Sequence, residues 1–212
     1  ISIIMKKIMF NSKYGLDKAV IEGWKTMTRR VISCPNTFKG QLVSGFYICR
    51  NRQSREITEV CMHDVDEGLI DNGQLLPNYK VGEVVAIAQS YKDCGYDPNF
   101  MLDGKPISKH SGWNNKMFVK AEMMKHFIKI TGVKVERLQD ISYTDIAAEG
   151  IKYNIDVMTN LRIFMFPNGE REFLDDRTAF RTLIDKISGK GTWKSNPWVW
   201  AYEFELTNNR NK

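Results

Sequence analysis

The end of the chain carries an alternation of residue types that only a β-sheet accommodates. Large apolar residues occupy every second position from Trp198 to Leu206, and small or acidic residues occupy most of the positions between them. Successive side chains of a strand point to opposite faces, so this period of two predicts a strand with one buried and one exposed face. Such a strand is stable only within a larger sheet that packs against other elements.

Six further segments are predicted as strands because β-branched and aromatic residues are frequent in them. They are residues 2–10, 45–50, 56–62, 83–89, 116–121 and 127–138. Segments 45–50 and 56–62 should form a hairpin across a polar turn at 51–54. In segment 127–138 the apolar residues change faces at Thr131-Gly132, which indicates a β-bulge or a tight turn. Residues 93–115 are rich in Gly, Pro, Asn and Asp and are predicted as a long loop.

Three helices are predicted from capping residues and apolar spacing. A short helix over 16–22 should end at Gly23, and a second should begin at Ser142 and close at Gly150. A third should start at Asp175 and place its apolar residues on one face. Short strands and a few helices in irregular order predict one α+β domain, 1–212, around a curled sheet or small barrel rather than a βαβ repeat.

Composition excludes several classes of protein. Hydrophobic residues make up 42% of the chain, enough for a packed core, and no stretch approaches the ~18 apolar residues of a membrane helix. Lys6-Lys7 interrupts the apolar opening, which also lacks a cleavage site, so we expect a cytoplasmic protein without membrane contact. The four cysteines form no C-x-x-C pair, and Cys61-Met62-His63 is a weak metal pattern by itself. We therefore expect no disulfide framework, no metal and no other cofactor.

The charge is divided unevenly along the chain. Residues 1–55 contain eleven Lys and Arg against Asp17 and Glu22, whereas the remainder contains twenty Lys and Arg against twenty-three acidic residues. A basic segment on a nearly neutral body favours a polyanionic partner such as RNA or single-stranded DNA. A cationic surface that only keeps the protein in solution explains the same numbers.

The basic segment Gly23–Arg30 contains residue types that suit catalysis. A lysine acts as a base when burial or neighbouring cations lower its pKa, and a threonine hydroxyl becomes a nucleophile beside such a base. A turn after Gly23 would bring Lys25 and Thr28 to one mouth, and a carboxylate would complete the set by carrying a proton to the leaving group.

A non-catalytic interpretation of the same segment stays open. In it Lys25, Arg29 and Arg30 contact phosphates, and Thr26 is a polar strand residue near the ligand. Trp24 precedes them in a predicted turn, where its ring could stack on an unpaired base or pack against the protein.

Four motifs occur in one order along the chain. Gly-x-Lys-Thr-x-Thr-x-Arg is followed by Tyr-Lys-x-Gly-Glu before a strand, then by Val-Glu-Arg-Leu-Gln-Asp-Ile-Ser running to Ala-x-Glu-Gly, and finally by Tyr-Glu-Phe. In this order the chain resembles ASCH domains of the PUA-like superfamily, especially the longer phage- and prophage-associated members. The motifs lie at Gly23 to Arg30, Tyr79 to Glu83, Val135 to Gly150 and Tyr202 to Phe204.

The resemblance implies a small closed PUA-like β-barrel with flanking short helices, and insertions near 33–75, 93–115 and 151–175. In the small ASCH amidohydrolases, which act on N4-acetylcytidine, a Lys, a Thr and a Glu form the catalytic set. Matched by motif, these fall on Lys25, Thr28 and Glu149, and a following Arg falls on Arg30 as a substrate-binding residue.

Two departures from the family pattern bear on activity. Arg29 stands where the small enzymes carry an apolar residue, and Ala88-Gln89-Ser90 replaces the Arg-Glu-Thr of the longer relatives. Because of these departures, the resemblance does not decide whether the domain is an enzyme. We expect a domain that binds RNA or a modified nucleoside at a basic pocket, and hydrolysis of an amide on an acylated nucleobase is the catalytic form of this hypothesis. The alternatives are a non-catalytic nucleic-acid-binding module and a phage accessory protein that acts on a protein partner.

Overall fold

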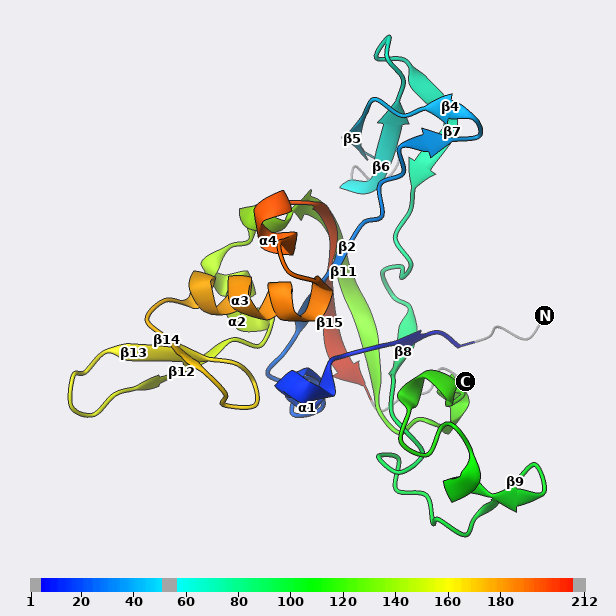
Figure 1. The fold of residues 1–212 in the computed structure, drawn as a ribbon, viewed down its shortest axis with the longest axis vertical. Helices are drawn as coiled ribbons and strands as arrows, with labels where there is room; N and C mark the ends of the chain where they lie inside the picture. The colour runs from blue at the N-terminus through cyan, green and yellow to red at the C-terminus, as the bar shows by residue number, and fades with distance from the viewer. Residues whose placement is uncertain (1–4, 51–56, 208–212) are drawn as a thin grey trace.

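A computed structural model describes residues 5–50 and 57–207 of the 212-residue chain. Its centre is a five-stranded sheet in the order β1-β8-β11-β15-β2 (Figure 1). β1 runs parallel to β8, and the other neighbours are antiparallel. The strands are β1 (Lys7–Ile8), β8 (Val84–Ile87), β11 (Phe127–Arg137), β15 (Trp198–Thr207) and β2 (Met27–Val31).

The long strands β11 and β15 organise this sheet. They pair over their whole lengths with one register shift between Ile130 and Gly132, which confirms the predicted bulge. β15 lies between two neighbours and both of its faces are covered over its first half, so Val199 and Ala201 are buried as fully as Tyr202. The predicted exposed face is therefore wrong there and begins only at Glu203.

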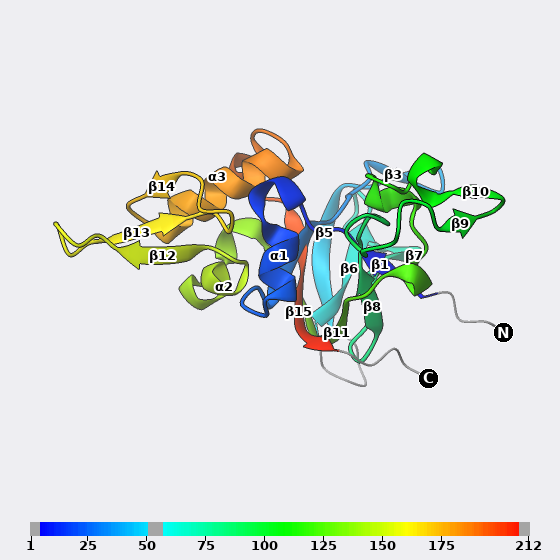
Figure 2. The ribbon, with the colours of Figure 1, turned by 90° about the horizontal axis from the view of Figure 1, so that it is seen from below.

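Helices α1 to α3 lie on the same side of the central sheet (Figure 2). The Ser142 side chain accepts from the Asp145 amide at the start of α2, and Gly150 follows α2 with a φ of 103°. Asp175 caps α3 in the same way, so the predicted helix boundaries are confirmed. The helices are α1 (Leu16–Ile21), α2 (Tyr143–Ala148), α3 (Asp176–Ser188) and α4 (Thr192–Ser195).

The predicted closed barrel is wrong, because the central sheet is open. Its edge strands β1 and β2 do not pair, and closure of a barrel requires its edges to hydrogen-bond. β1 is only two residues long, and the chain passes through η1 (Ser12–Tyr14) and α1 before β2 begins. The gap between the edges is bridged instead by the Arg30 side chain, which donates to the carbonyl of Met9.

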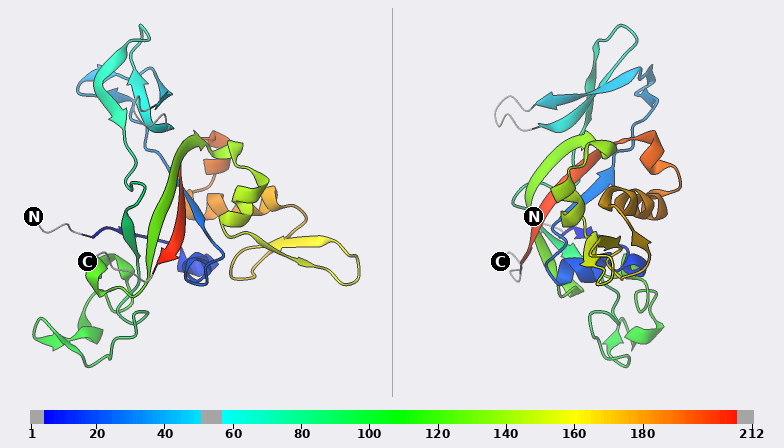
Figure 3. Two further views of the ribbon diagram at one scale, coloured as in Figure 1. Left: turned by 180° about the vertical axis from the view of Figure 1, so that it is seen from behind. Right: turned by 90° about the vertical axis from the view of Figure 1, so that its left-hand side faces the viewer.

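Three small sheets project from this body as two lobes, a wing of two sheets and an arm of one. The wing holds β3 to β7 and extends from one end of the central sheet, and the arm holds β12 to β14 and extends beside α2 and α3 (Figures 1 and 3). The wing strands are β3 (Thr37–Phe38), β4 (Gln41–Leu42), β5 (Gly45–Arg50), β6 (Ile57–His63) and β7 (Leu69–Leu75). The arm strands are β12 (Lys152–Ile155), β13 (Arg162–Met165) and β14 (Glu172–Phe173).

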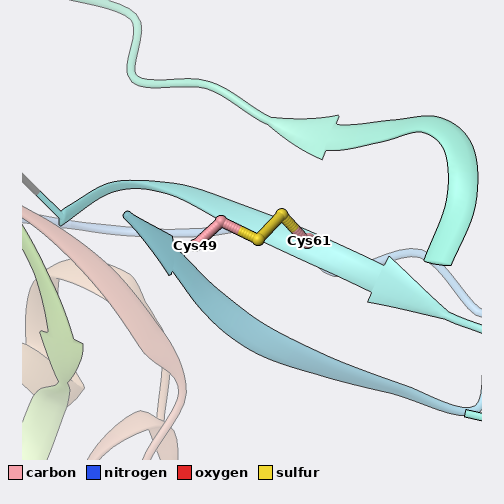
Figure 4. Close-up of a disulfide and its surroundings, with 2 residues drawn as sticks. All are labelled: Cys49 and Cys61. Atoms are coloured by element: carbon pink, nitrogen blue, oxygen red, sulfur yellow. A yellow bond between two sulfur atoms is a disulfide. The ribbon is translucent and has the colours of Figure 1, made fainter. Parts of the chain in front are cut away.

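The pairing of β5 with β6 confirms the predicted hairpin, whose turn at 51–54 lies outside the described residues. Cys49 and Cys61 are diagonal neighbours on these strands and form a disulfide, with their Cα atoms 6.1 Å apart (Figure 4). The sequence analysis expected no disulfide framework and did not foresee this one disulfide. Their proximity depends on the register of the hairpin, which cysteine spacing does not reveal.

The predicted long loop 93–115 is mostly irregular but has its own small core. Its Cys94 and Ile107 pack with Tyr91, Val119 and Met124 in a separate apolar cluster. Within this region lie β9 (Met101–Leu102), β10 (Lys105–Pro106) and η2 (Ile107–Lys109).

The strand predicted over 116–121 is absent. In its place lie η3 (Lys116–Phe118) and η4 (Ala121–Met123), and a further short 3-10 turn, η5 (Leu138–Asp140), follows β11. The Asn115 side chain accepts from the Met117 amide and so starts the turn that replaces the strand.

Residues 5–50 and 57–207 contain neither a membrane-spanning helix nor a cluster of metal ligands. No helix in these ranges is long and apolar enough to span a membrane. No group of three or more His, Cys, Asp or Glu side chains there is arranged to hold a metal ion.

The packing of α3 can be tested by truncation. Phe180 is 1% exposed and lies edge-on to Trp193, so Phe180→Ala should cost about 3–5 kcal/mol of unfolding free energy through lost burial and a cavity. Leu174, just before the same helix, is 78% exposed, so Leu174→Ala should change stability by less than about 0.5 kcal/mol. Urea denaturation measures both values, and equal losses would contradict the packing described.

Candidate functional site

A cavity of about 490 Å³ opens at the gap between the edge strands β1 and β2. The segment after β1 forms one rim, β2 and the end of α2 form the floor, and apolar residues of α3 form the opposite wall. Its polar side chains are Asn11, Ser12, Lys25, Thr28, Arg29, Arg30, Lys116, Glu149 and Ser188.

The turn after α1 delivers Lys25 to this cavity. Gly23 adopts a left-handed conformation with a φ of 81°, and the amides of Trp24 and Lys25 both donate to the Ala19 carbonyl. This turn directs the Lys25 side chain inward, where it is 1% exposed. The sequence analysis predicted one turn that holds both Lys25 and Thr28, but β2 already begins at Met27. Lys25 therefore reaches the cavity from the turn and Thr28 from the strand.

Lys25 and Glu149 form a buried ion pair although 124 residues separate them. The Lys25 ammonium lies 2.7 Å from Glu149 Oε2 and also donates to the carbonyls of Met27 and Glu149, each at 2.6 Å. These three acceptors match the three N–H groups of the ammonium. Burial lowers the pKa of Lys25, and Arg30 and Arg29 act in the same direction, while Glu149 opposes them.

Glu149 is the C-cap residue of α2, and only 5% of its surface is exposed. A glutamate at the end of a short helix is usually solvated, but here Gly150 turns the chain and the carboxylate points inward. Its second oxygen, Oε1, accepts from Arg29 Nη1 at 3.2 Å. Each carboxylate oxygen is thus held by a different cation.

The Thr28 hydroxyl lines the same cavity and is free of hydrogen bonds to any residue in the described ranges. Thr28 is 5% exposed, is the second residue of β2 and pairs with Tyr202 of β15. The structure therefore brings Thr28, Lys25 and Glu149 to one cavity, but Lys25 Nζ is hydrogen-bonded to Glu149 rather than to Thr28.

Arg29 and Arg30 differ sharply in how their guanidinium groups are used. Arg29 has a carboxylate partner at each of its three nitrogens, from Glu136, Asp145 and Glu149. Arg30 donates to the Met9 carbonyl, and its Nε is buried without an acceptor in the described residues. Burial lowers the pKa of Arg30.

An aromatic ring supports Arg30 at the cavity. Its guanidinium carbon lies 5.5 Å from the centre of the Phe10 ring, and both residues line the cavity. Arg30 therefore keeps unused hydrogen-bonding capacity at this position.

Two residues predicted to bind substrate lie elsewhere. Trp24 donates from its indole to Glu22 at 2.9 Å, Lys152 lies 5.0 Å from its ring centre, and the ring does not line the cavity. Thr26, just before β2, is exposed and lines a different depression. The other five predicted site residues line the cavity.

Sequence reasoning missed the rim and the apolar wall. Lys116 reaches the rim from 104 residues away to donate to the Ser12 hydroxyl at 2.6 Å. The wall is the apolar face of α3, with Phe180, Leu183 and Ile184. The α3 periodicity was visible in the sequence, but nothing local indicated which element its face would meet.

Comparison of the chain with protein-family models, curated proteins and solved structures finds no match. The chemistry of the cavity is therefore argued from its own residues. They combine a buried Lys–Glu pair, an unbonded hydroxyl, a partly unsatisfied guanidinium and an apolar wall.

A double-mutant cycle tests the buried pair. Lys25→Met and Glu149→Gln should each lower the unfolding free energy by about 3 kcal/mol, because each leaves a buried partner uncompensated. The double variant should lose less than the sum of the two. The matched control is the exposed pair Lys6–Glu83, whose side chains are 47% and 24% exposed, and the same substitutions there should cost about 1 kcal/mol or less. Additive losses at Lys25 and Glu149 in urea denaturation would contradict the coupling.

Proposed function

We propose that the cavity is an active site that binds a modified nucleoside, alone or within RNA, and hydrolyses an amide on its acylated base. One observation carries the proposal. A hydroxyl without a hydrogen-bond partner, on Thr28, lines the same cavity as the buried Lys25–Glu149 pair. Nucleophile, base and proton carrier are the groups that amide hydrolysis requires. The resemblance of the motifs to ASCH amidohydrolases supports the same assignment.

The shape and charge of the cavity support a nucleoside as ligand. A volume of about 490 Å³ falls within the range of small-molecule pockets. The apolar face of α3 offers a surface for a flat ring, while Arg30 beside Phe10 offers unused donors for a carbonyl or hydroxyl. Among the described lining residues Glu149 is the one carboxylate, and Arg29 and Lys25 neutralise it.

In the proposed reaction neutral Lys25 accepts the Thr28 hydroxyl proton as Oγ attacks the acyl carbon. Lys25 passes a proton to Glu149, which is in direct hydrogen-bond contact, and Glu149 protonates the departing nitrogen as the C–N bond breaks. Thr28 then carries the acyl group as an ester. Water, deprotonated by the same pair, hydrolyses this ester and releases the carboxylic acid. Arg30 donates to the carbonyl oxygen, on which negative charge develops.

This role requires an uncharged Lys25, and the surroundings act in both directions. Burial, Arg30 and Arg29 lower the pKa of Lys25, and Glu149 raises it. Only the neutral amine accepts a proton, so kcat/KM should rise with pH and level off above the pKa of Lys25.

One observation favours a second candidate, a binding module without catalysis. All three N–H groups of the Lys25 ammonium already have acceptors, which is the arrangement of a structural ion pair. In that case Lys25 and Glu149 only shape the cavity, and Arg30 holds the phosphate or base of a bound nucleotide.

Turnover of an N-acylated cytidine by the purified protein separates the two candidates. Lys25→Ala and Thr28→Ala should each lower kcat by at least about a hundredfold, and the double variant should be little worse than either. Glu149→Gln should slow turnover while substrate still binds. Thr26→Ala is the matched control, because this neighbouring threonine is exposed outside the cavity and its loss should leave kcat unchanged.

The binding module predicts different results for the same variants. Thr28→Ala would leave affinity for the nucleoside nearly unchanged, whereas Arg30→Ala would weaken it. A folded protein that leaves a broad panel of acylated nucleosides intact would reject the hydrolase. A folded protein that also binds none of them in calorimetry would reject both candidates.

A further inference from the structure

The Lys25–Glu149 pair belongs to a network of six charged side chains that extends from the cavity to solvent at Lys134. The cations are Lys25, Arg29 and Lys134, and the anions are Glu136, Asp145 and Glu149. Three positive and three negative charges balance when all six groups are ionised. Removing one charge therefore leaves a net charge that the other five experience.

Arg29 is the centre of this network. Its side chain is fully buried, and each of its nitrogens has a carboxylate partner. Nε lies 2.7 Å from Glu136 Oε1, Nη2 lies 2.6 Å from Asp145 Oδ2, and Nη1 lies 3.2 Å from Glu149 Oε1. A guanidinium held at three sides has a fixed position, and so does the Glu149 oxygen that it binds.

The outer end of the network meets solvent. Lys134 is 40% exposed and contacts Asp145 at 2.8 Å and Glu136 at 3.3 Å. Neither of these two carboxylates lines the cavity, so each can be substituted while every lining residue keeps its own side chain. Both contact Arg29, which is the lining residue through which they act. Although burial alone would raise the pKa of Asp145, hydrogen bonds from Lys134 and Arg29 hold it below its ordinary value of 3.8. Asp145 is therefore an anion at neutral pH.

We propose that Arg29, fixed by Glu136 and Asp145, is a positioning residue that orients the Glu149 carboxylate and sets the charge on Lys25. The inference rests on the proposed function of the cavity and assigns Arg29 a role within it. Arg29 holds Oε1 of Glu149, so only Oε2 is left to Lys25. A carboxylate shared in this way retains the lysine proton less strongly than one that turns both oxygens to it.

The groups that face Lys25 define the direction of each effect. They are Glu149 from α2, Arg29 and Arg30 from β2, and the Phe10 ring, whose centre lies 6.0 Å from Nζ. Lys116 lines the same cavity from the rim. Removing a negative charge from the network lowers the pKa of Lys25, and removing a positive charge raises it.

The experiment changes the outer network and measures Lys25. Asp145→Asn and Glu136→Gln keep the shape of the side chains and remove one negative charge each. Each should shift the acid limb of the kcat/KM profile to lower pH by about half a pH unit or more. Arg29→Gln should shift this limb to higher pH. A purely structural role predicts lower activity at every pH with the limb in place.

Asp66→Asn is the matched control for Asp145→Asn. Asp66 lies exposed in the turn after β6, and the same chemical change there should leave the profile unchanged. Should Arg29→Gln fail to fold in thermal unfolding, the other two variants still carry the test. The inference is overturned if the acid limb of the kcat/KM profile stays in place in both Asp145→Asn and Glu136→Gln. It is also overturned if Asp66→Asn moves the limb by the same amount.

A second readout does not need turnover. The Lys25 side-chain Cε and Nζ resonances, identified by their loss in Lys25→Met, report its titration directly by nuclear magnetic resonance. Shifts in the stated directions in a protein that hydrolyses nothing would support the network and reject the proposed function. An unmoved titration in an active protein would reject the network and leave the proposed function standing.

Discussion

The buried contact between Lys25 and Glu149 ties together parts of the chain that local structure would leave apart. It joins the turn before β2 to the last turn of α2, and the Lys25 ammonium also binds the carbonyls on both sides of the contact. Two charges withdrawn from water are tolerated only when every donor and acceptor is satisfied. The position of α2 against β2, the floor of the cavity and the depth of Thr28 all follow from this requirement.

Arg29 is a second buried charge whose partners come from distant parts of the chain. An arginine buried at this position of β2 requires carboxylate partners. Glu136 of β11 and Asp145 of α2 supply them, at 2.7 Å and 2.6 Å. Both partners lie more than a hundred residues away in the sequence. Because these partners reach solvent through Lys134, the chemistry of the cavity is connected to a second surface.

The open edge of the central sheet explains where the cavity lies. A barrel would seal the gap between β1 and β2 with hydrogen bonds, but here the gap is lined by Arg30, Phe10 and the apolar face of α3. The cavity therefore exists because the central sheet does not close into the predicted barrel. An unpaired edge leaves backbone and side chains accessible, which a ligand site needs.

Local signals in the sequence determined much of the secondary structure. Ser142 and Asp175 start helices because their side chains accept backbone amides, Gly23 and Gly150 end them because glycine tolerates positive φ, and the parity change near Gly132 places the bulge. The motif order also named Lys25, Thr28, Arg30 and Glu149, which the structure brings to one cavity.

Tertiary structure alone decided the rest, because each remaining feature depends on which distant segments meet. Local pattern does not reveal whether β1 and β2 pair, that Glu149 is buried rather than solvated, or that Cys61 lies diagonally across a hairpin from Cys49. The same holds for the carboxylate partners of Arg29 and for the position of Trp24 outside the cavity. Charge and hydrogen-bonding capacity are properties of a residue, but their use is set by neighbours that only the folded chain supplies.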